Sequence, residues 1–222
     1  MYTFGKSKHG QLTVGELCQG HAKPVLVDRN QAFDGEAVVM VSFSSEHSAC
    51  ITYYGSLWTW GDLFYGALGI GQCLTVSADG RTERKLRPER VRIEHFGDSP
   101  AIVVSCGELC TCILTAAGQM WMTGVACSLN RHDPGAQRLK RIIHPGTARI
   151  DFILCRMDTQ LRWTWRAWCG HGAKTTAVNW GTNGKAQVQH RLRGMSHTQY
   201  ILALLVTSLS CLLVQGVFIR WW

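Results

Sequence analysis

Short apolar and β-branched runs alternate with glycine-containing turns over the first half of the chain. Residues 38–41 and 49–52 are two such runs, a turn follows at residues 54–56, and residues 57–60 form a third run. Runs of this length that are bounded by turn residues are typical of strands. The pattern therefore predicts an antiparallel hairpin whose tryptophans pack between sheets, because exposing large aromatic side chains is unfavourable.

This hairpin pattern recurs along the chain at two fixed distances. Residues 105–124 match residues 42–61 at an offset of 63, and residues 4–15 match residues 60–71 at an offset of 56. A period longer than about 50 residues indicates a propeller blade or a solenoid unit. One small sheet cannot bury both of its faces, so each unit requires neighbours.

Most positions that carry the repeat are glycines and aromatic residues. Glycine reaches a positive φ without a Cβ clash, which suits the tight turns where the chain leaves a sheet. We assign structural roles in the repeat to Gly5, Gly10, Leu12, His47, Gly55, Trp58, Trp60, Gly61, Gly66, Leu68, Gly69, Gly118, Trp121 and Gly124.

Three segments together resemble the regulator of chromosome condensation repeat. They are the strand around His47-Ser48, the Trp58-Thr59-Trp60-Gly61 sequence and the Gly66-Ala67-Leu68-Gly69 sequence. The resemblance covers residues 2–124 and continues more weakly to residue 153. Departures are Ser44 and Ser45, where the family favours glycine, and Cys110, which stands where His47 stands in the preceding copy.

The resemblance implies a fold of the β-propeller class, which in this family has seven blades. We expect an all-β chain, an incomplete β-propeller of about three partial blades over residues 1–153, beginning inside a repeat at residues 2–5. A tail that is irregular or helical is expected over residues 154–222. Since an open arc leaves apolar faces and strand edges in water, residues 1–153 alone are expected to be aggregated, oligomeric or molten.

The charge balance adds little to the expected fold or partner. The chain has 23 basic and 15 acidic residues, a net charge of +8, which raises nucleic acid as a partner. The basic run at residues 81–92, however, contains two glutamates and a proline, and is interpreted as a solvated loop between blades. Direct nucleic-acid binding is therefore not expected.

The ten cysteines do not form a compact disulfide framework, and no signal peptide follows Met1. A reducing, intracellular location in the cytoplasm or nucleus is expected. Cys106, Cys110 and Cys112 are the one cluster, and their even spacing places them on one buried strand face with Ile102, Val104 and Leu114. A zinc site normally has four ligands, so core packing is the favoured interpretation.

The tail changes character at residue 154, where four tryptophans follow no strand or helix period. Reverse translation of residues 157–182, read two bases later, permits a further copy of the repeat, which suggests a reading-frame break between residues 153 and 157. Residues 200–219 carry no charge and have the length of a membrane span, with Arg191 and Arg193 before them and Arg220 after them.

No set of residues indicates catalysis, a cofactor or a metal. The glycines of residues 66–71 lack the Gly-Lys-Ser/Thr ending of a phosphate loop. His47 and Ser48 are neighbours on a strand and point to opposite faces, which does not suit a catalytic pair. Enzymatic activity is therefore not expected.

The expected function is that of a β-propeller module that binds a protein partner. The resemblance implies partners such as a small GTPase, through guanine-nucleotide exchange, or a chromatin protein, since the family also includes chromatin-binding propellers and propellers attached to ubiquitin ligases. Two alternatives stay open. One is a tail-anchored membrane protein with a cytosolic β domain, and the other is a truncated or mis-predicted product without its own activity.

Overall fold

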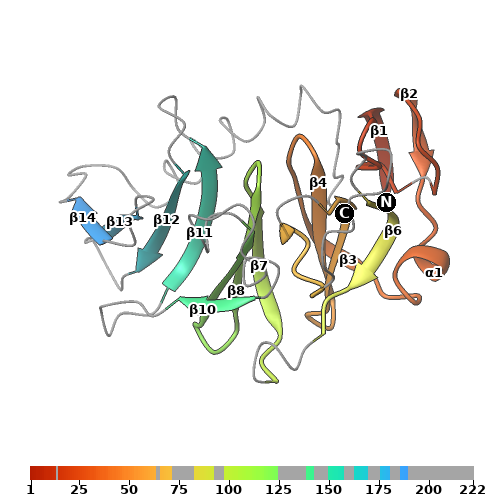
Figure 1. Ribbon diagram of the computed structural model, residues 1–222. Helices are drawn as coiled ribbons and strands as arrows, with labels where there is room; N and C mark the ends of the chain where they lie inside the picture. The colour runs from red at the N-terminus through yellow and green to blue at the C-terminus, as the bar shows by residue number, and fades with distance from the viewer. Residues whose placement is uncertain are drawn as a thin grey trace.

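The computed structural model describes residues 1–13, 15–63, 66–71, 83–92, 98–124, 139–142, 150–157, 163–169, 176–180 and 186–189. These residues are almost entirely β-strands (Figure 1). The first half of the chain contains β1 (Tyr2–Lys6), β2 (Gly20–Leu26), α1 (Arg29–Ala32), β3 (Val38–Phe43), β4 (His47–Thr52), β5 (Leu57–Asp62) and β6 (Arg84–Arg90). The second half contains β7 (Ala101–Cys106), β8 (Cys110–Thr115), β9 (Met120–Gly124), β10 (Lys140–Ile142), β11 (Ile150–Met157), β12 (Trp163–Cys169), β13 (Thr176–Trp180) and β14 (Ala186–Gln189).

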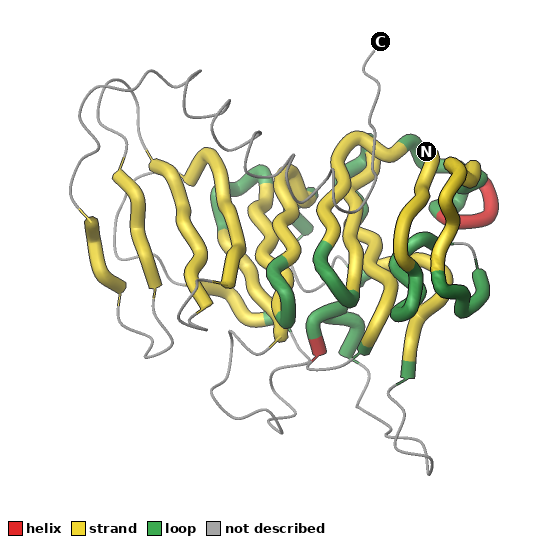
Figure 2. Tube along the Cα trace, turned by 90° about the horizontal axis from the view of Figure 1, so that it is seen from above, coloured by secondary structure: helices red, strands yellow, loops and turns green. Residues whose placement is uncertain are grey.

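The strands form one two-stranded and three four-stranded antiparallel sheets. Their orders are β1-β2, β3-β4-β5-β6, β7-β8-β9-β10 and β11-β12-β13-β14, so neighbouring strands in each sheet are also consecutive in the chain. The four sheets lie side by side in chain order (Figures 1 and 2). Contacts join β3 and β4 to β7, and β7 and β8 to β11. The expected all-β, incomplete propeller is confirmed.

The second sheet buries both of its faces. On β4, Ala49 and Ile51 face the core shared with the third sheet. Cys50 faces the opposite way, into a core with Trp58 and Trp60. This alternation follows from the two-residue period of a strand, and it explains why the residues of β4 after His47 are apolar or small.

The aromatic core between the first two sheets depends on the short helix α1. Asp28 caps this helix by accepting a hydrogen bond from the backbone N–H of Asn30. Phe33 follows directly after the helix and is completely buried. Its ring centroid lies 5.8 Å from that of Trp58 and 6.1 Å from that of Trp60. The expected burial of these two tryptophans is confirmed, whereas Trp121 is half-buried against the core shared by the second and third sheets.

Two expectations, one about the basic run and one about the tail, are wrong for the residues that the structure describes. The basic run was expected to be a loop, but residues 84–90 form β6, which pairs with β5. The tail was expected to be irregular or helical, but its described residues form the strands β12, β13 and β14. Tryptophan, threonine and valine favour strands intrinsically, and backbone pairing with β11 does not require an alternating apolar pattern.

The boundary expected between residues 153 and 154 falls inside β11, and as a domain limit it stays a prediction, as does the reading-frame break. Within the described residues, no helix is long and apolar enough to cross a membrane. The uncharged segment at residues 200–219 lies outside those residues.

Candidate functional site

Matched glycines of the repeat share one backbone geometry. Gly5, Gly61 and Gly124 have φ values of 109°, 108° and 91°, which side-chain-bearing residues rarely adopt. A Cβ at Gly61 would lie 2.5 Å from the carbonyl oxygen of Glu46, and one at Gly124 would lie 2.2 Å from that of Leu109. Gly61 and Gly124 therefore each allow the third strand of their sheet to approach the second, and the sequence offset of 63 is reproduced in the structure.

The loops that contain Gly10-Gln11-Leu12 and Gly66-Ala67-Leu68 are each closed by a hydrogen bond from a threonine of the preceding strand. Thr3 Oγ1 donates to the carbonyl oxygen of Leu12 at 2.8 Å, and Thr59 Oγ1 donates to that of Leu68 at 2.9 Å. These pairs are separated by the offset of 56 found in the sequence. The loop glycines Gly10, Gly66 and Gly69 all have positive φ, which supports their predicted structural role.

The next sheet in the chain then holds each loop through a hydroxyl group. Ser48 Oγ donates to the carbonyl oxygen of Gln11 at 3.2 Å, and its counterpart Thr111 donates to that of Ala67 at 2.8 Å. Trp60 Nε1 also donates to the backbone carbonyl oxygen of Gln11, at 2.7 Å. The Ser/Thr position after the repeat histidine therefore ties successive sheets together, and none of these groups faces solvent.

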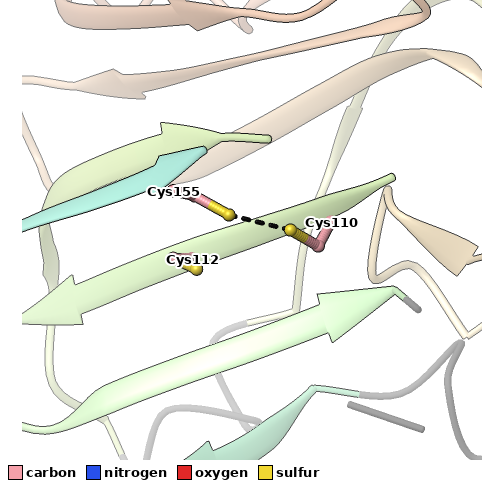
Figure 3. Close-up of side chains that lie close together, drawn as sticks. All are labelled: Cys110, Cys112 and Cys155. Atoms are coloured by element: carbon pink, nitrogen blue, oxygen red, sulfur yellow. Dashed lines mark hydrogen bonds between the residues drawn. The ribbon is translucent and has the colours of Figure 1, made fainter. Parts of the chain in front are cut away.

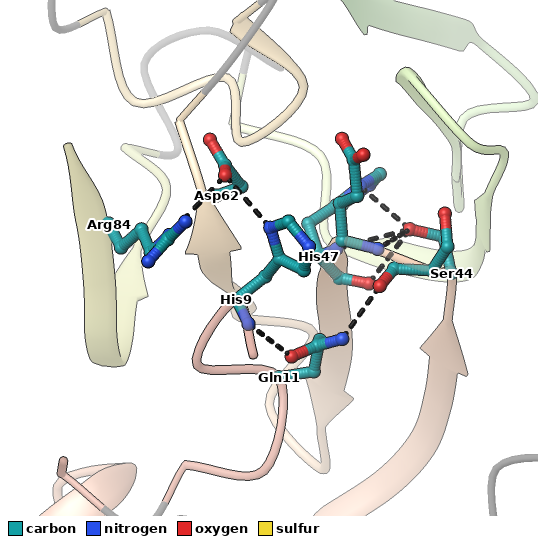
Figure 4. A network of polar contacts seen from close by, with 8 residues as sticks. His9, Gln11, Ser44, His47, Asp62 and Arg84 are labelled. Carbon is teal, nitrogen blue, oxygen red and sulfur yellow. Dashed lines mark hydrogen bonds and ion pairs between the residues drawn. The ribbon is translucent and has the colours of Figure 1, made fainter. Parts of the chain in front are cut away.

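His47 is a buried link between the second and third sheets. Its Nδ1 lies 2.9 Å from Ser44 Oγ (Figure 4). Its Nε2 lies 2.8 Å from Thr111 Oγ1. The Thr111 hydroxyl also donates to the carbonyl oxygen of Ala67 at 2.8 Å, so it contacts both the imidazole and the preceding loop. Burial lowers the pKa of His47 to about 4, against the opposing charge of Asp62, so the ring is neutral at pH 7.

A polar network surrounds Asp62 at the end of β5. The carboxylate lies 3.0 Å from His9 Nδ1 and 3.5 Å from Arg84 Nε, and so connects the first sheet to β6 (Figure 4). Nearby, Gln11 accepts a hydrogen bond from the His9 backbone N–H and donates to the Ser45 carbonyl oxygen at 2.6 Å. These contacts hold the loop at residues 9–11 against the second sheet.

The cysteine cluster differs from the one expected. Cys106 packs with Val104 in the core between the second and third sheets, so it lies on the opposite face from Cys110 and Cys112. Those two residues instead meet Cys155 from β11 (Figure 3). The bulge between Ala101 and Val103 also turns Ile102 to the surface, so the expectation of one shared buried face was wrong.

The basic strand β6 is neutralised by neighbouring acids. Lys85 Nζ lies 3.2 Å from Glu89 and 3.8 Å from Glu83, and Arg90 lies 3.6 Å from Glu36. Such exposed pairs add little stability, but they cancel much of the positive charge of the strand.

One end of the second and third sheets carries exposed apolar side chains. Tyr53 and Tyr54, in the β4–β5 turn, are 75% and 71% exposed, with ring centroids 5.6 Å apart. Val39 and Ile102 are both 43% exposed. They occupy matched positions in bulges of β3 and β7. We name this group the tyrosine edge: Val39, Tyr53, Tyr54 and Ile102.

Backbone hydrogen bonds connect the segments that carry the tyrosine edge. The N–H of Tyr53 donates to the carbonyl of Ala37, just before β3, and the N–H of Ala101 donates to that of Gly55, in the same turn as the tyrosines. Residues 54–56 were expected from the sequence only to form a turn. Two adjacent tyrosines in a turn cannot both enter a core, and that signal could have revealed the exposed pair.

The meandering sheets, the repeated glycine geometry and the hydroxyl ties define a β-propeller repeat protein. A sequence model of the regulator of chromosome condensation (RCC1) repeat matches residues 1–51 and 54–114. The chain belongs to this family.

Curated relatives match somewhat more than half of the chain. The ultraviolet-B receptor UVR8 of Arabidopsis thaliana is 32% identical over 122 residues, which are 55% of this chain and 24% of the receptor. The probable E3 ubiquitin-protein ligase HERC3 of Homo sapiens is 26% identical over 133 residues, which are 60% of this chain and 11% of the ligase. The chain thus spans a quarter or less of the length of these curated relatives.

Solved structures show the same fold. Human WBSCR16 superposes with a TM-score of 0.56 at 16% identity, over 78% of this chain and 40% of that protein. Prp20p from Saccharomyces cerevisiae superposes with a TM-score of 0.54 at 16% identity, over 69% of this chain and 36% of Prp20p.

Proposed function

We propose that the protein is a protein–protein interaction module and that the tyrosine edge is its contact surface. The observation that carries this proposal is the pair of highly exposed, mutually packed tyrosines, Tyr53 and Tyr54. Interface cores are enriched in aromatic residues and depleted of charged ones. Val39 and Ile102 extend the same surface across two sheets, which gives a partner more than one anchor.

The partner class that we propose is a small GTPase or a chromatin protein. Support comes from the fold shared with Prp20p, whose structure was described together with its binding to Gsp1p and histones. A role in guanine-nucleotide exchange is the finer form of this proposal. Direct binding of nucleic acid is not proposed, because Lys85 and Arg90 of β6 are paired with glutamates and Arg84 is paired with Asp62.

For its location we propose the interior of the cell, in the cytoplasm or the nucleus. Buried thiols such as Cys50 and Cys106 are unpaired in the described structure, which suits a reducing compartment. Insertion of residues 200–219 into a membrane would place the propeller segment at a membrane surface.

The test uses the full chain with Gsp1p and core histones as probes, measured by biolayer interferometry. The double variant Tyr53→Ser/Tyr54→Ser should weaken binding at least about tenfold, as expected for anchoring aromatic residues. Leu17→Ser is the matched control, because Leu17 is 54% exposed and lies outside the tyrosine edge.

The outcomes test the proposed contact surface and the proposed partner class independently. Binding that is unchanged in the tyrosine double variant would refute the tyrosine edge as the contact surface. Failure of both probes to bind the unmodified chain would refute the proposed partner class. Faster release of labelled GDP from Gsp1p would support the exchange role, and an unchanged release rate would contradict it.

A further inference from the structure

Three buried thiols gather between the third and fourth sheets. Cys110 and Cys112 lie on β8, Cys155 lies on β11, and their sulfur atoms all fall within 4.8 Å of one another (Figure 3). Cys110 and Cys112 are completely buried, and Cys155 is 6% exposed. The sulfur atoms of Cys110 and Cys155 are 2.8 Å apart. The three sulfur atoms thus converge from two strands at one buried place.

Gly107 makes room for this convergence. A Cβ at this position would lie 2.7 Å from the Cys155 sulfur and 2.8 Å from the Cys110 sulfur. Real Cβ atoms essentially never approach other atoms this closely. The thiol cluster therefore depends on the absence of a side chain at residue 107.

The preceding repeat fills the equivalent space differently. At an offset of 63, Gly107 corresponds to Ser44 and Cys110 corresponds to His47, and in that repeat the serine hydroxyl contacts the imidazole at 2.9 Å. The third sheet thus has a cluster of thiols where the second sheet has a hydroxyl–imidazole pair. Simple core packing requires no such concerted change, because an apolar side chain at position 110 would suffice.

The donor set selects the kind of ion. Thiolate sulfur prefers soft ions such as Cu(I) and zinc. Structural zinc is almost always held by four ligands, and in the described part of the chain this group has three potential ligands. With metal–sulfur bonds of about 2.3 Å, three sulfurs around one ion would lie about 4.0 Å apart, so the Cys110 and Cys155 sulfurs need to separate by about 1.2 Å.

We propose that Cys110, Cys112 and Cys155 form a three-sulfur binding site for one soft monovalent cation of the Cu(I) class. Each Cu–S bond to a thiolate replaces an S–H bond and releases one proton to solvent, with no change of oxidation state.

The test is an anaerobic titration of the reduced full chain with Cu(I), in competition with the chelator bathocuproine disulfonate. The unmodified chain should bind one equivalent that is lost, or weakened at least about tenfold, in Cys112→Val. Gly107→Ala should have the same effect although it retains all three thiols. Cys50→Ala is the matched control, because Cys50 is equally buried but lies in the core between the first two sheets.

X-ray absorption at the copper edge gives an independent reading, with three sulfur neighbours expected. Near-UV circular dichroism shows whether each variant keeps its packing, and Cys155→Ala replaces any variant that does not. The proposal is overturned if the tight equivalent survives in Cys112→Val and Gly107→Ala, or if the unmodified chain binds zinc more tightly than Cu(I). A Cys110–Cys155 disulfide found by mass spectrometry in the anaerobically purified chain would also overturn it.

Discussion

Lowering the pH from 7 should destabilise the protein through His47. This side chain is completely buried between Ser44 and Thr111, and its burial lowers the pKa from 6.5 to about 4. Between these two values the unfolded chain binds a proton that the folded chain does not. The stabilising contribution is therefore fully present above pH 6.5 and is lost as the pH falls towards 4.

The magnitude follows from the difference between the two pKa values. Each pKa unit corresponds to 1.36 kcal/mol, so the full contribution is about 3 kcal/mol, of which about 2 kcal/mol is lost at pH 5. Glu46 acts in the opposite direction, because desolvation raises its pKa in the fold. A comparison of two variants that both retain Glu46 removes its effect.

The assay is urea denaturation of the full chain and of His47→Gln at pH 7 and pH 5. Glutamine does not titrate, so the unmodified chain should lose about 2 kcal/mol more free energy of unfolding than His47→Gln between these pH values. Equal losses in the two proteins would refute the assignment of His47 as a neutral, buried link. A gain of stability at pH 5 that depends on His47 would show that the ring is charged in the fold.

Two further predictions concern the repeat geometry, and a third concerns the ion pairs of β6. Gly61→Ala and Gly124→Ala should each destabilise the fold by about 1–3 kcal/mol in a denaturant series, because both combine a positive φ with a close backbone approach; tolerance of either change would contradict the shared geometry. Thr3→Val and Thr59→Val should each cost about 1–2 kcal/mol in the same assay, since each leaves a loop carbonyl without its donor, and a stabilising effect of either would disprove the loop closure. Lys85→Ala should change the free energy of unfolding by less than about 0.5 kcal/mol, as its ion pairs are partly exposed; a much larger loss would show that β6 depends on them.

The repeat could be predicted from the sequence because its constraints are local. Gly61 and Gly124 occupy positions where the backbone excludes a Cβ, and such positions leave a glycine at a fixed spacing. The burial of Trp60 followed from the strand pattern in the same way. The role of Thr59 in closing its own loop was not predicted, although the matched threonine at position 3 was a signal for it.

The remaining features depend on which sheets meet, and single-strand patterns do not contain that information. Cys155 joins Cys110 only because β11 packs beside β8. Ile102 was expected to be buried because strict alternation was assumed, whereas a bulge in β7 reverses its direction. The strands of the tail were missed because the tryptophans in β12 follow no apolar period, while backbone pairing with β11 needs none.

The most direct test of the propeller assignment is a set of inter-strand nuclear Overhauser effects in the isotopically labelled full chain. The account predicts cross-strand contacts between His47 and Gly61 and, at the matched positions, between Cys110 and Gly124, because these residues are paired in register. Sequential amide–amide contacts typical of a helix across residues 49–60 would contradict it.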